Sequence, residues 1–327
     1  FLRGNILTGF PWNLVAYTWS WSPELIQILS IIGTYSFSLV SITLFSLPFL
    51  FFQKKIYKNN VFFVIFFFTL LVFNYLYGYS KIKENKFKFN ENIKVKIISP
   101  NFTLQEFQSM DEFLLLQNLI GYSSPEKDVK TLFIWPEGIF YESNLSQIEQ
   151  YKNIFSKQFS KNHLIILGVN NFVKKSNNTN YFNSLVLLNH QLEILAVYNK
   201  NYLVPFGEFL PFESILSKIG LKKITKGYNS FSPGKDRKNI ILDNSFESKI
   251  ILPLICYEII YSGKIKNKNQ RPDLVINISE DAWFGDSIGP YQHFSKSIYR
   301  SVEEGVFIAR SANKGISAII NPNGIPI

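Results

Sequence analysis

The chain has 327 residues, enough for a large core, and 46% of them are hydrophobic and 17% aromatic. Its net charge of +10 is spread along the chain without a dense basic patch or a base-stacking motif, which argues against nucleic acid and favours a membrane surface as partner. One cysteine and three scattered histidines exclude an internal disulfide and a thiolate cluster, so neither a metal site nor a cofactor is expected.

Residues 1–91 are predicted to form a membrane region. Residues 25–52 and 61–79 contain no charged side chain, and a helix that spans a bilayer needs about 20 apolar residues. Both stretches are therefore predicted to be transmembrane helices, in preference to two helices buried in a soluble core. The aromatic segment 4–23 is broken by glycine and proline and is predicted to lie at the membrane interface, whereas residues 80–91 are predicted to form a linker. Lysines flank both ends of the second helix, so charge alone does not orient the chain.

From residue 92 the pattern changes to strands mixed with helices. Apolar runs predict strands at residues 93–98, 131–135, 164–169, 184–188, 192–198, 250–255, 274–278, 306–309 and 316–320. Helical spacing predicts helices at residues 104–120, 148–159 and 293–304. The polar stretches 170–183 and 222–239 are predicted to be loops. Strands that are apolar throughout are typical of sheets covered on both faces, so residues 92–327 are predicted to form an α/β domain.

A nucleophilic site is predicted where three of these strands end. Cys256 follows one strand, Glu137 another and Lys200 a third. A thiol nucleophile needs a base to take its proton, and the oxyanion formed by its attack on a carbonyl needs a positive charge or a backbone N–H group. Cys256 is therefore the candidate nucleophile, Glu137 the candidate base and Lys200 the candidate cation. A lone cysteine after a strand is more often a small buried hydrophobe, but the coincidence of all three groups favours a site.

Five neighbouring residues are candidates for supporting or substrate-binding roles. Glu208 and Glu258 stand beside the three motifs and are expected to orient Lys200 or tune Cys256, the alternative being that each caps a turn. Tyr257 directly follows the candidate nucleophile. Trp283 and Phe284 precede a glycine and predict an aromatic loop near the site, although such a pair also suits a packed turn.

Together these motifs resemble those of the nitrilase superfamily, and more specifically those of the bacterial apolipoprotein N-acyltransferases. The resemblance covers almost the whole chain and rests on TGFPW at residues 8–12, WPE at 135–137, Lys200 with VPFGE at 204–208, CYE at 256–258, and DAWFG at 281–285. Three positions depart from the family pattern: Tyr202 replaces a histidine, Ser279-Glu280-Asp281 replaces Thr-Asn-Asp, and Ser99-Pro100-Asn101 replaces a Gln-Gly-Asn-like segment. These departures concern loop geometry and substrate detail.

The resemblance implies a nitrilase-like α-β-β-α sandwich preceded by transmembrane helices. It implies that Cys256 takes a fatty acyl chain from a phospholipid as a thioester and passes it to the N-terminal α-amino group of diacylglyceryl-cysteine in an apolipoprotein. Glu137 is then the general base and Lys200 stabilises the tetrahedral intermediate. The same resemblance implies the bacterial inner membrane, with the catalytic domain on the periplasmic side.

The family has membrane helices before and after the region matched here, so we expect the chain to be an internal fragment and residues 92–327 to be truncated at the C-terminus. One alternative is a membrane-tethered amidase that hydrolyses a C–N bond with the same three residues, using water as acceptor. Another is a binding module on a decayed scaffold, which the retention of all three candidate residues argues against.

Overall fold

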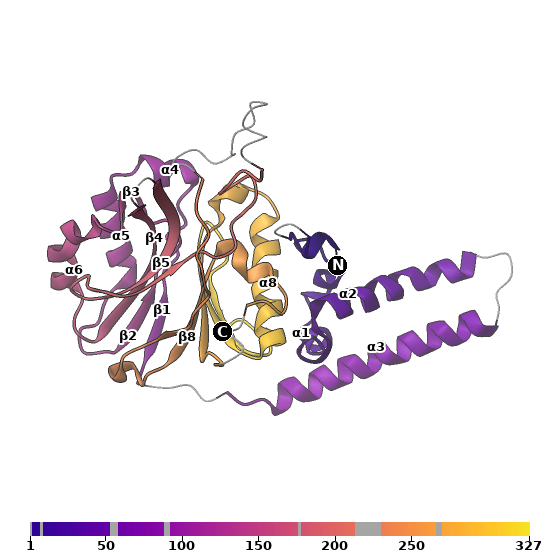
Figure 1. The fold of residues 1–327 in the computed structure, drawn as a ribbon. Coiled ribbons are helices and arrows are strands. Elements are labelled where there is room, and N and C mark those ends of the chain that lie inside the picture. The colour runs from indigo at the N-terminus through magenta and orange to yellow at the C-terminus, as the bar shows by residue number, and fades with distance from the viewer. Residues whose placement is uncertain are drawn as a thin grey trace.

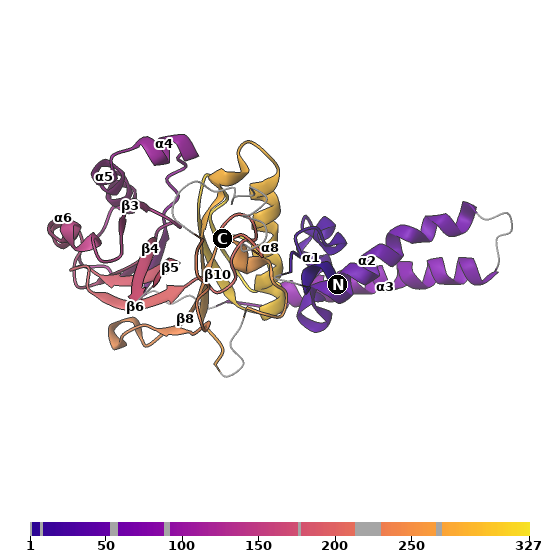
Figure 2. The same ribbon diagram turned by 45° about the horizontal axis from the view of Figure 1, so that its top comes forward.

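The computed structural model shows an α/β body and a helical arm (Figure 1). The arm consists of two long helices and projects from the body on the side of helix α8 (Gly289–Glu304). A second view shows the same arrangement, with the arm directed away from the strands (Figure 2). The residues that the structure describes are 2–6, 9–52, 58–87, 92–175, 178–212, 230–265 and 270–327.

The two uncharged stretches of the N-terminal region form the arm. The first is divided into α1 (Pro23–Ile26), α2 (Leu29–Ser46) and η3 (Leu47–Phe52), with a kink at Gly33, whose φ of 73° suits glycine. The second is α3 (Lys58–Glu84). By length and composition, α2 with η3 and α3 are each able to cross a membrane, and few of their side chains are buried. Both helices lie where they were predicted, but the first is interrupted rather than continuous.

The segment before the arm packs against α8. It contains two short 3₁₀ helices, η1 (Leu2–Gly4) and η2 (Val15–Trp19). The ring of Tyr17 contacts that of Tyr299 on α8, with centroids 4.8 Å apart, and the Tyr299 hydroxyl donates to the carbonyl of Ala16. The aromatic N-terminal segment therefore packs against the α/β body.

The first sheet is mixed and has the strand order β1-β2-β4-β5-β6, with β3 paired to β4. β1, β2, β3 and β4 run parallel, whereas β4, β5 and β6 form an antiparallel meander. The strands are β1 (Lys94–Ile97), β2 (Thr131–Ile134), β3 (Phe140–Asn144), β4 (His163–Lys175), β5 (Asn178–Asn189) and β6 (Ile194–Asn199).

The second sheet has the order β11-β10-β9-β8-β7, and its three central strands are parallel. The outer strands pair antiparallel to their neighbours. The strands are β7 (Ile240–Ile241), β8 (Ile250–Ile255), β9 (Leu274–Glu280), β10 (Phe307–Asn313) and β11 (Ala318–Ile320).

Four layers result, because each central strand is apolar on both faces. In β2, Leu132 and Ile134 join a core cluster shared by the two sheets, while Phe133 points into a cluster with the outer helices. Those helices are α4 (Leu104–Ser109), α5 (Glu112–Ser123) and α6 (Lys152–Gln158), with η4 (Ile148–Tyr151) before α6. On the far side, α8 and η7 (Cys256–Ile260) cover the second sheet through a third cluster. The predicted α-β-β-α sandwich is confirmed.

Two local predictions fail. The described part of the stretch 170–183 is not a loop, because β4 and β5 continue through it as a long hairpin, paired as far as Lys175 and Asn178. Backbone pairing tolerates polar side chains, which is why the composition was misleading. The helix expected at 104–120 is broken at Asp111, whose side chain accepts from the first backbone N–H groups of α5.

Strands β3 and β7 were not predicted, since neither is a sustained apolar run. Thr8 of the TGFPW motif, residues 88–91 of the expected linker and residues 222–229 of the second expected loop lie outside the described residues.

Candidate active site

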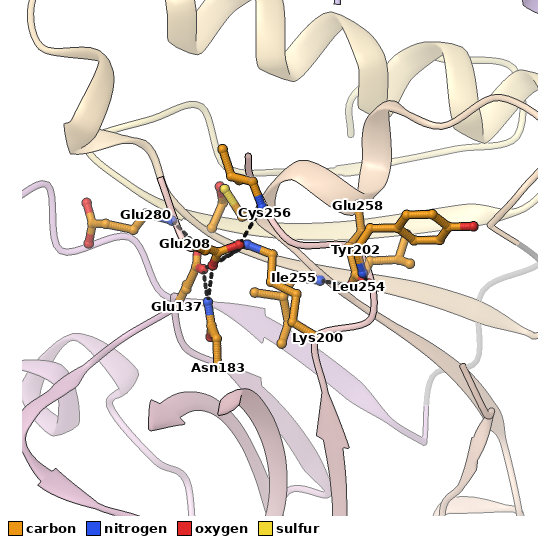
Figure 3. A network of polar contacts seen from close by, with 12 residues as sticks. Glu137, Asn183, Lys200, Tyr202, Glu208, Leu254, Ile255, Cys256, Glu258 and Glu280 are labelled. Atoms are coloured by element: carbon orange, nitrogen blue, oxygen red, sulfur yellow. Dashed lines mark hydrogen bonds and ion pairs between the residues drawn. The ribbon is translucent and has the colours of Figure 1, made fainter. Parts of the chain in front are cut away.

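A cavity of about 580 Å³ opens where strands of both sheets end, beneath α8 and the N-terminal segment. It is lined by Glu137, Lys200 and Cys256, the three candidates for base, cation and nucleophile. Glu208 and Glu280 complete its polar floor. The side chains of Glu137, Glu208 and Lys200 point toward one another, with Cys256 beside them (Figure 3). The structure therefore brings together three side chains that are widely separated in sequence.

Lys200 lies one residue beyond β6, and its N–H group donates to the carbonyl of Asn183 on β5. Its side chain is only 1% exposed. The ammonium lies 2.8 Å from Glu208 Oε1 and 3.6 Å from Glu137 Oε1. Burial opposes the charge, but the two carboxylates outweigh it and raise the pKa of Lys200. The site therefore holds a permanent, fixed positive charge.

Glu137 is held from two sides. Its Oε1 accepts from Asn183 Nδ2 at 2.6 Å, and its Oε2 accepts from the backbone N–H of Glu280 at 2.9 Å. Burial raises the pKa of Glu137, and the charge of Lys200 opposes that rise. The backbone of Gly168 approaches so closely that a Cβ there would come within 2.6 Å of the Glu137 Cα. A glycine is thus required for this carboxylate to reach its place.

Cys256 begins η7 directly after β8 with a φ of 49°, a left-handed conformation that is uncommon for a side chain other than glycine or asparagine. Strain of this kind costs about 1 to 3 kcal/mol and clusters at functional sites. Burial raises the pKa of the thiol, the Glu137 carboxylate raises it further, and Lys200 opposes both. These effects together favour the neutral thiol form of Cys256.

The neighbouring Glu258 does not line the cavity. Its Oε2 accepts from the backbone N–H of Ile255, the last residue of β8, at 2.9 Å. Its Oε1 accepts from the N–H groups of Asn201 and Tyr202 and is 3.3 Å from Arg237 Nη2. This buried carboxylate therefore links the strand that ends before Cys256 to the loop that follows Lys200, which is a positioning role rather than direct contact with the cavity.

The aromatic residues predicted near the site form its upper wall. Tyr257 lines the cavity, and its hydroxyl donates to the carbonyl of Gly9 at 2.7 Å. Phe284 packs on Trp12, with ring centroids 5.5 Å apart, and Phe10 stacks on Tyr257. Trp283 also lines the cavity and is 51% exposed. The N-terminal segment thus completes a hydrophobic entrance, a role that spacing along the sequence did not reveal for Phe10 or Trp12.

Two polar residues in the site were not predicted. Asn183 also donates to Glu208 Oε1 at 3.0 Å, so one amide aligns both carboxylates around Lys200. Glu280 accepts from Asn313 Nδ2 and from the Ala282 N–H, and burial raises its pKa to about 8. Glu280 is the last residue of β9 and directly precedes the DAWFG motif, so its position at a strand end is a signal that could have identified it.

A buried ionic cluster supports the loop that carries Cys256, the candidate nucleophile. Asp281 accepts from Arg310 Nη2 at 2.7 Å and lies 2.9 Å from His293 Nδ1. The other nitrogen of His293 is 3.2 Å from the Cys256 carbonyl oxygen. Burial favours the neutral form of Asp281, but Arg310 and then His293 outweigh it and lower its pKa. Within the described residues no group of three or more metal-ligating side chains occurs.

The fold and site define a class that comparison with known proteins identifies. The family model of the carbon-nitrogen hydrolases matches residues 135–327, more than half of the chain, so the chain belongs to this family. The model of the apolipoprotein N-acyltransferase N-terminal domain matches residues 1–47. A CN-hydrolase superfamily protein from Xanthomonas campestris has a crystal structure that matches with a TM-score of 0.48 and 15% identity, covering 71% of this chain and 83% of that one.

Within that class, the predicted resemblance is confirmed by curated relatives named apolipoprotein N-acyltransferase. The protein of that name from Rhodopseudomonas palustris is 31% identical over 99% of this chain and 62% of its own length. That from Rickettsia bellii is 34% identical over 99% of this chain and 63% of its own length. The chain therefore spans a little over six tenths of the length of these relatives.

Proposed function

We propose that the chain carries the catalytic part of an acyltransferase that moves a fatty acyl chain from a phospholipid to an apolipoprotein. The acceptor is the N-terminal α-amino group of diacylglyceryl-cysteine. The observation that carries the proposal is the single cavity that holds a thiol, a buried carboxylate and a fixed ammonium, in a chain similar along its length to proteins named for this activity. Glu137, Lys200 and Cys256 are the proposed catalytic residues.

In the first half-reaction the thiol of Cys256 gives its proton to Glu137. The resulting thiolate attacks the ester carbonyl of the phospholipid, and the charge that develops on the carbonyl oxygen is stabilised by the Lys200 ammonium. The tetrahedral intermediate then breaks the bond to the glycerol oxygen, which takes the proton from Glu137 and leaves as the alcohol of a lysophospholipid. The acyl chain remains on the sulfur as a thioester.

In the second half-reaction the free amine of the acceptor attacks the thioester carbonyl. Lys200 again faces the oxyanion, and Glu137 takes the proton that the amine loses as the amide forms. The C–S bond breaks, and the sulfur recovers a proton from Glu137, so the enzyme returns to its starting state. Glu208 and Asn183 do not exchange protons in this scheme. They hold Lys200 and Glu137 at 2.8 and 2.6 Å respectively, so that the charges stay in place between the two steps.

The apolar surface of the helical arm supports a membrane location for the protein. Residues 1–91 form the proposed membrane region and residues 92–327 the proposed catalytic domain. On α2, η3 and α3 the exposed side chains are largely apolar, with Phe62, Phe66 and Phe73 among them, and lipid is the environment in which such a surface is stable. The segment that leads into the arm also forms the cavity wall, so both lipid-anchored substrates reach the thiol from the membrane. We place the protein in the bacterial inner membrane, with the catalytic domain on the periplasmic side.

The test uses the full-length protein, purified with all its membrane helices. It is mixed with a phospholipid labelled in its acyl chain and a diacylated lipopeptide. We expect the label to appear on the lipopeptide amine, and we expect the protein alone with phospholipid to gain the mass of one acyl chain on Cys256, removable by hydroxylamine. The Cys256→Ser variant is expected to stay folded and to lose transfer.

Two outcomes would contradict the proposal. Release of free fatty acid, or of ammonia from a small amide, without any lipopeptide product would show that water is the acceptor, as in an amidase. Transfer at the normal rate by the Cys256→Ser variant would place the nucleophile elsewhere. The exposed Ser146 offers a matched control, Ser146→Ala, because that side chain does not line the cavity and its loss should change neither readout.

A further inference from the structure

A second cavity, of about 460 Å³, adjoins the one that contains the thiol. Trp12 and Gln292 line both cavities, and the Trp12 indole N–H donates to Gln292 Oε1 at 2.7 Å. The remaining wall comes from side chains within residues 13–20 of the N-terminal segment and from Tyr291, Ser295 and Lys296 on α8. The second cavity is therefore a neighbour of the first, and the two share the Trp12 indole and the Gln292 amide.

The ammonium of Lys296 is the unusual feature of this second cavity. The residue is 1% exposed, and its Nζ lies 4.5 Å from the centre of the Trp12 ring and 4.4 Å from that of Tyr17. Among the described residues none accepts a hydrogen bond from it or forms an ion pair with it. Two aromatic faces attract a cation but accept little from its N–H groups. The ammonium therefore carries donors that the protein itself does not satisfy.

The surroundings offer no anion to compensate. No aspartate or glutamate is among the residues that line the cavity. The charged group that acts on Lys296 is Arg300, one turn further along α8, and it repels the ammonium. Burial, and then Arg300, lower the pKa of Lys296 to about 7. A buried cation without a partner is costly, so the cavity is built for a ligand that brings the negative charge.

We propose that the Lys296 cavity binds the phosphate group of a membrane phospholipid. The ammonium supplies the charge, and the Gln292 amide nitrogen, whose partner oxygen is already used by Trp12, supplies a second donor. The cavity is large enough for a phosphodiester with its glycerol carbons. Part of its wall is the N-terminal segment that leads into α1 and α2. In that segment, Trp19 at the end of η2 and Trp21 just after it suit the depth of lipid headgroups.

A phosphate bound there sits beside the thiol cavity, because Trp12 belongs to both. That the bound lipid is the acyl donor rests on the proposed function; that the cavity binds a lipid phosphate does not. Free phosphate has the same recognition chemistry, so the experiment must separate the two sources. It must also work in protein that does not turn over, which the Cys256→Ala variant provides.

The experiment measures binding by calorimetry to the full-length Cys256→Ala protein in an uncharged detergent. The probes are a short-chain phosphatidylethanolamine, the diacylglycerol with the same chains, and inorganic phosphate. We expect the phospholipid to bind more tightly than either of the other two. Adding Lys296→Met should weaken phospholipid binding at least about tenfold and leave diacylglycerol binding unchanged. Lys249→Met removes an exposed lysine as the matched control and should change nothing.

Three results would overturn the proposal. The first is equal phospholipid affinity with and without Lys296→Met. The second is diacylglycerol binding as tight as phospholipid binding. The third is tight binding of inorganic phosphate at Lys296 with no competition from the phospholipid, which would make the cavity a free-anion site. None of these results bears on acyl transfer, which is measured separately with Cys256 intact.

A measurement on the unmutated lysine keeps the test decisive if Lys296→Met does not fold. A phosphodiester keeps one negative charge throughout the neutral range, so only the protein titrates. Besides Arg300 and Tyr291 on α8, the groups around the cavity are Tyr17, whose pKa burial raises to about 12, and His293 across Trp12, whose pKa burial and Arg310 lower. Lys296 is thus the group that titrates, and phospholipid affinity should fall up to about tenfold per pH unit above pH 7. An affinity independent of pH in this range would refute the proposal.

Discussion

The two cavities that share Trp12 each contain a lysine that is 1% exposed, yet the two lysines are opposite in charge balance. Lys200 faces two carboxylates, which raise its pKa, whereas Lys296 faces two aromatic rings and an arginine, and its pKa is lowered to about 7. Because the two residues are equally exposed, the difference in the direction of their pKa shifts comes from the groups around each ammonium. A lysine whose charge is balanced inside the protein suits a catalytic cation, and one whose charge is unbalanced suits a binding site that the ligand completes.

Removing the balanced lysine should have the largest effect. Lys200→Met leaves Glu137 and Glu208 facing each other without the cation between them. Breaking a buried ion pair from one side costs about 3 to 5 kcal/mol, and loss of oxyanion stabilisation lowers turnover about a hundredfold to a thousandfold. We expect a lower unfolding midpoint and acyl transfer reduced by at least the latter factor. Thermal unfolding and the labelled-lipid assay measure the two effects.

The exposed Lys249→Met is the control, because its ion pair with Glu247 is solvent-exposed and such pairs contribute at most about 1 kcal/mol. If Lys200→Met retained near-normal turnover, Lys200 would not be the catalytic cation and the contrast with Lys296 would lose its functional meaning.

Glu137→Gln tests the base in the same cavity. Glutamine cannot take the thiol proton. Its amide nitrogen also cannot accept the hydrogen bond that the Glu280 N–H now donates to Glu137 Oε2. A general base contributes about a hundredfold to ten-thousandfold, so formation of the acyl adduct on Cys256 should slow by that range. Time-resolved mass spectrometry of the intact protein follows the adduct. The exposed Glu126→Gln should form adduct at the normal rate, and equal rates in Glu137→Gln would assign the base elsewhere.

Sequence patterns predict the catalytic cavity far better than its neighbour, and the reason is physical. Glu137, Lys200 and Cys256 each follow a strand with a strong local signal, so strand ends alone bring them together. Asn183 lies in a polar stretch for which the sequence predicts a loop. Only the register of β4 with β5 reveals its contact with Glu137. Lys296 reads as an ordinary helix lysine, since its burial depends on packing of the distant segment that carries Trp12.

Glu280→Gln tests whether a carboxyl in the catalytic cavity is kept neutral. Burial raises the pKa of Glu280 to about 8, above its unfolded value of about 4.3. The stability from this shift is fully present below the unfolded pKa and is lost as pH rises through about 8. The variant lacks that loss. Its free energy of unfolding should therefore match that of the wild type near pH 5 and exceed it near pH 9 by a few kcal/mol at most, which the unfolding midpoints report. Parallel midpoints at both pH values would show that Glu280 is ionised throughout.

The smallest effect, and the one of opposite sign, is expected from Lys296→Met. The methionine keeps most of the volume between Trp12 and Tyr17 but removes the unbalanced charge. Without a lipid, the free energy of unfolding should therefore stay the same or rise slightly, by about 1 kcal/mol, in contrast to the fall expected for Lys200→Met. The depressed pKa of Lys296 means that its stability is present above the unfolded value of about 10 and is lost as pH falls toward 7, so the gain should be larger at pH 7 than at pH 10. A clear loss of stability in Lys296→Met at neutral pH would mean that the protein itself balances this charge, and the two lysines would then not differ in kind.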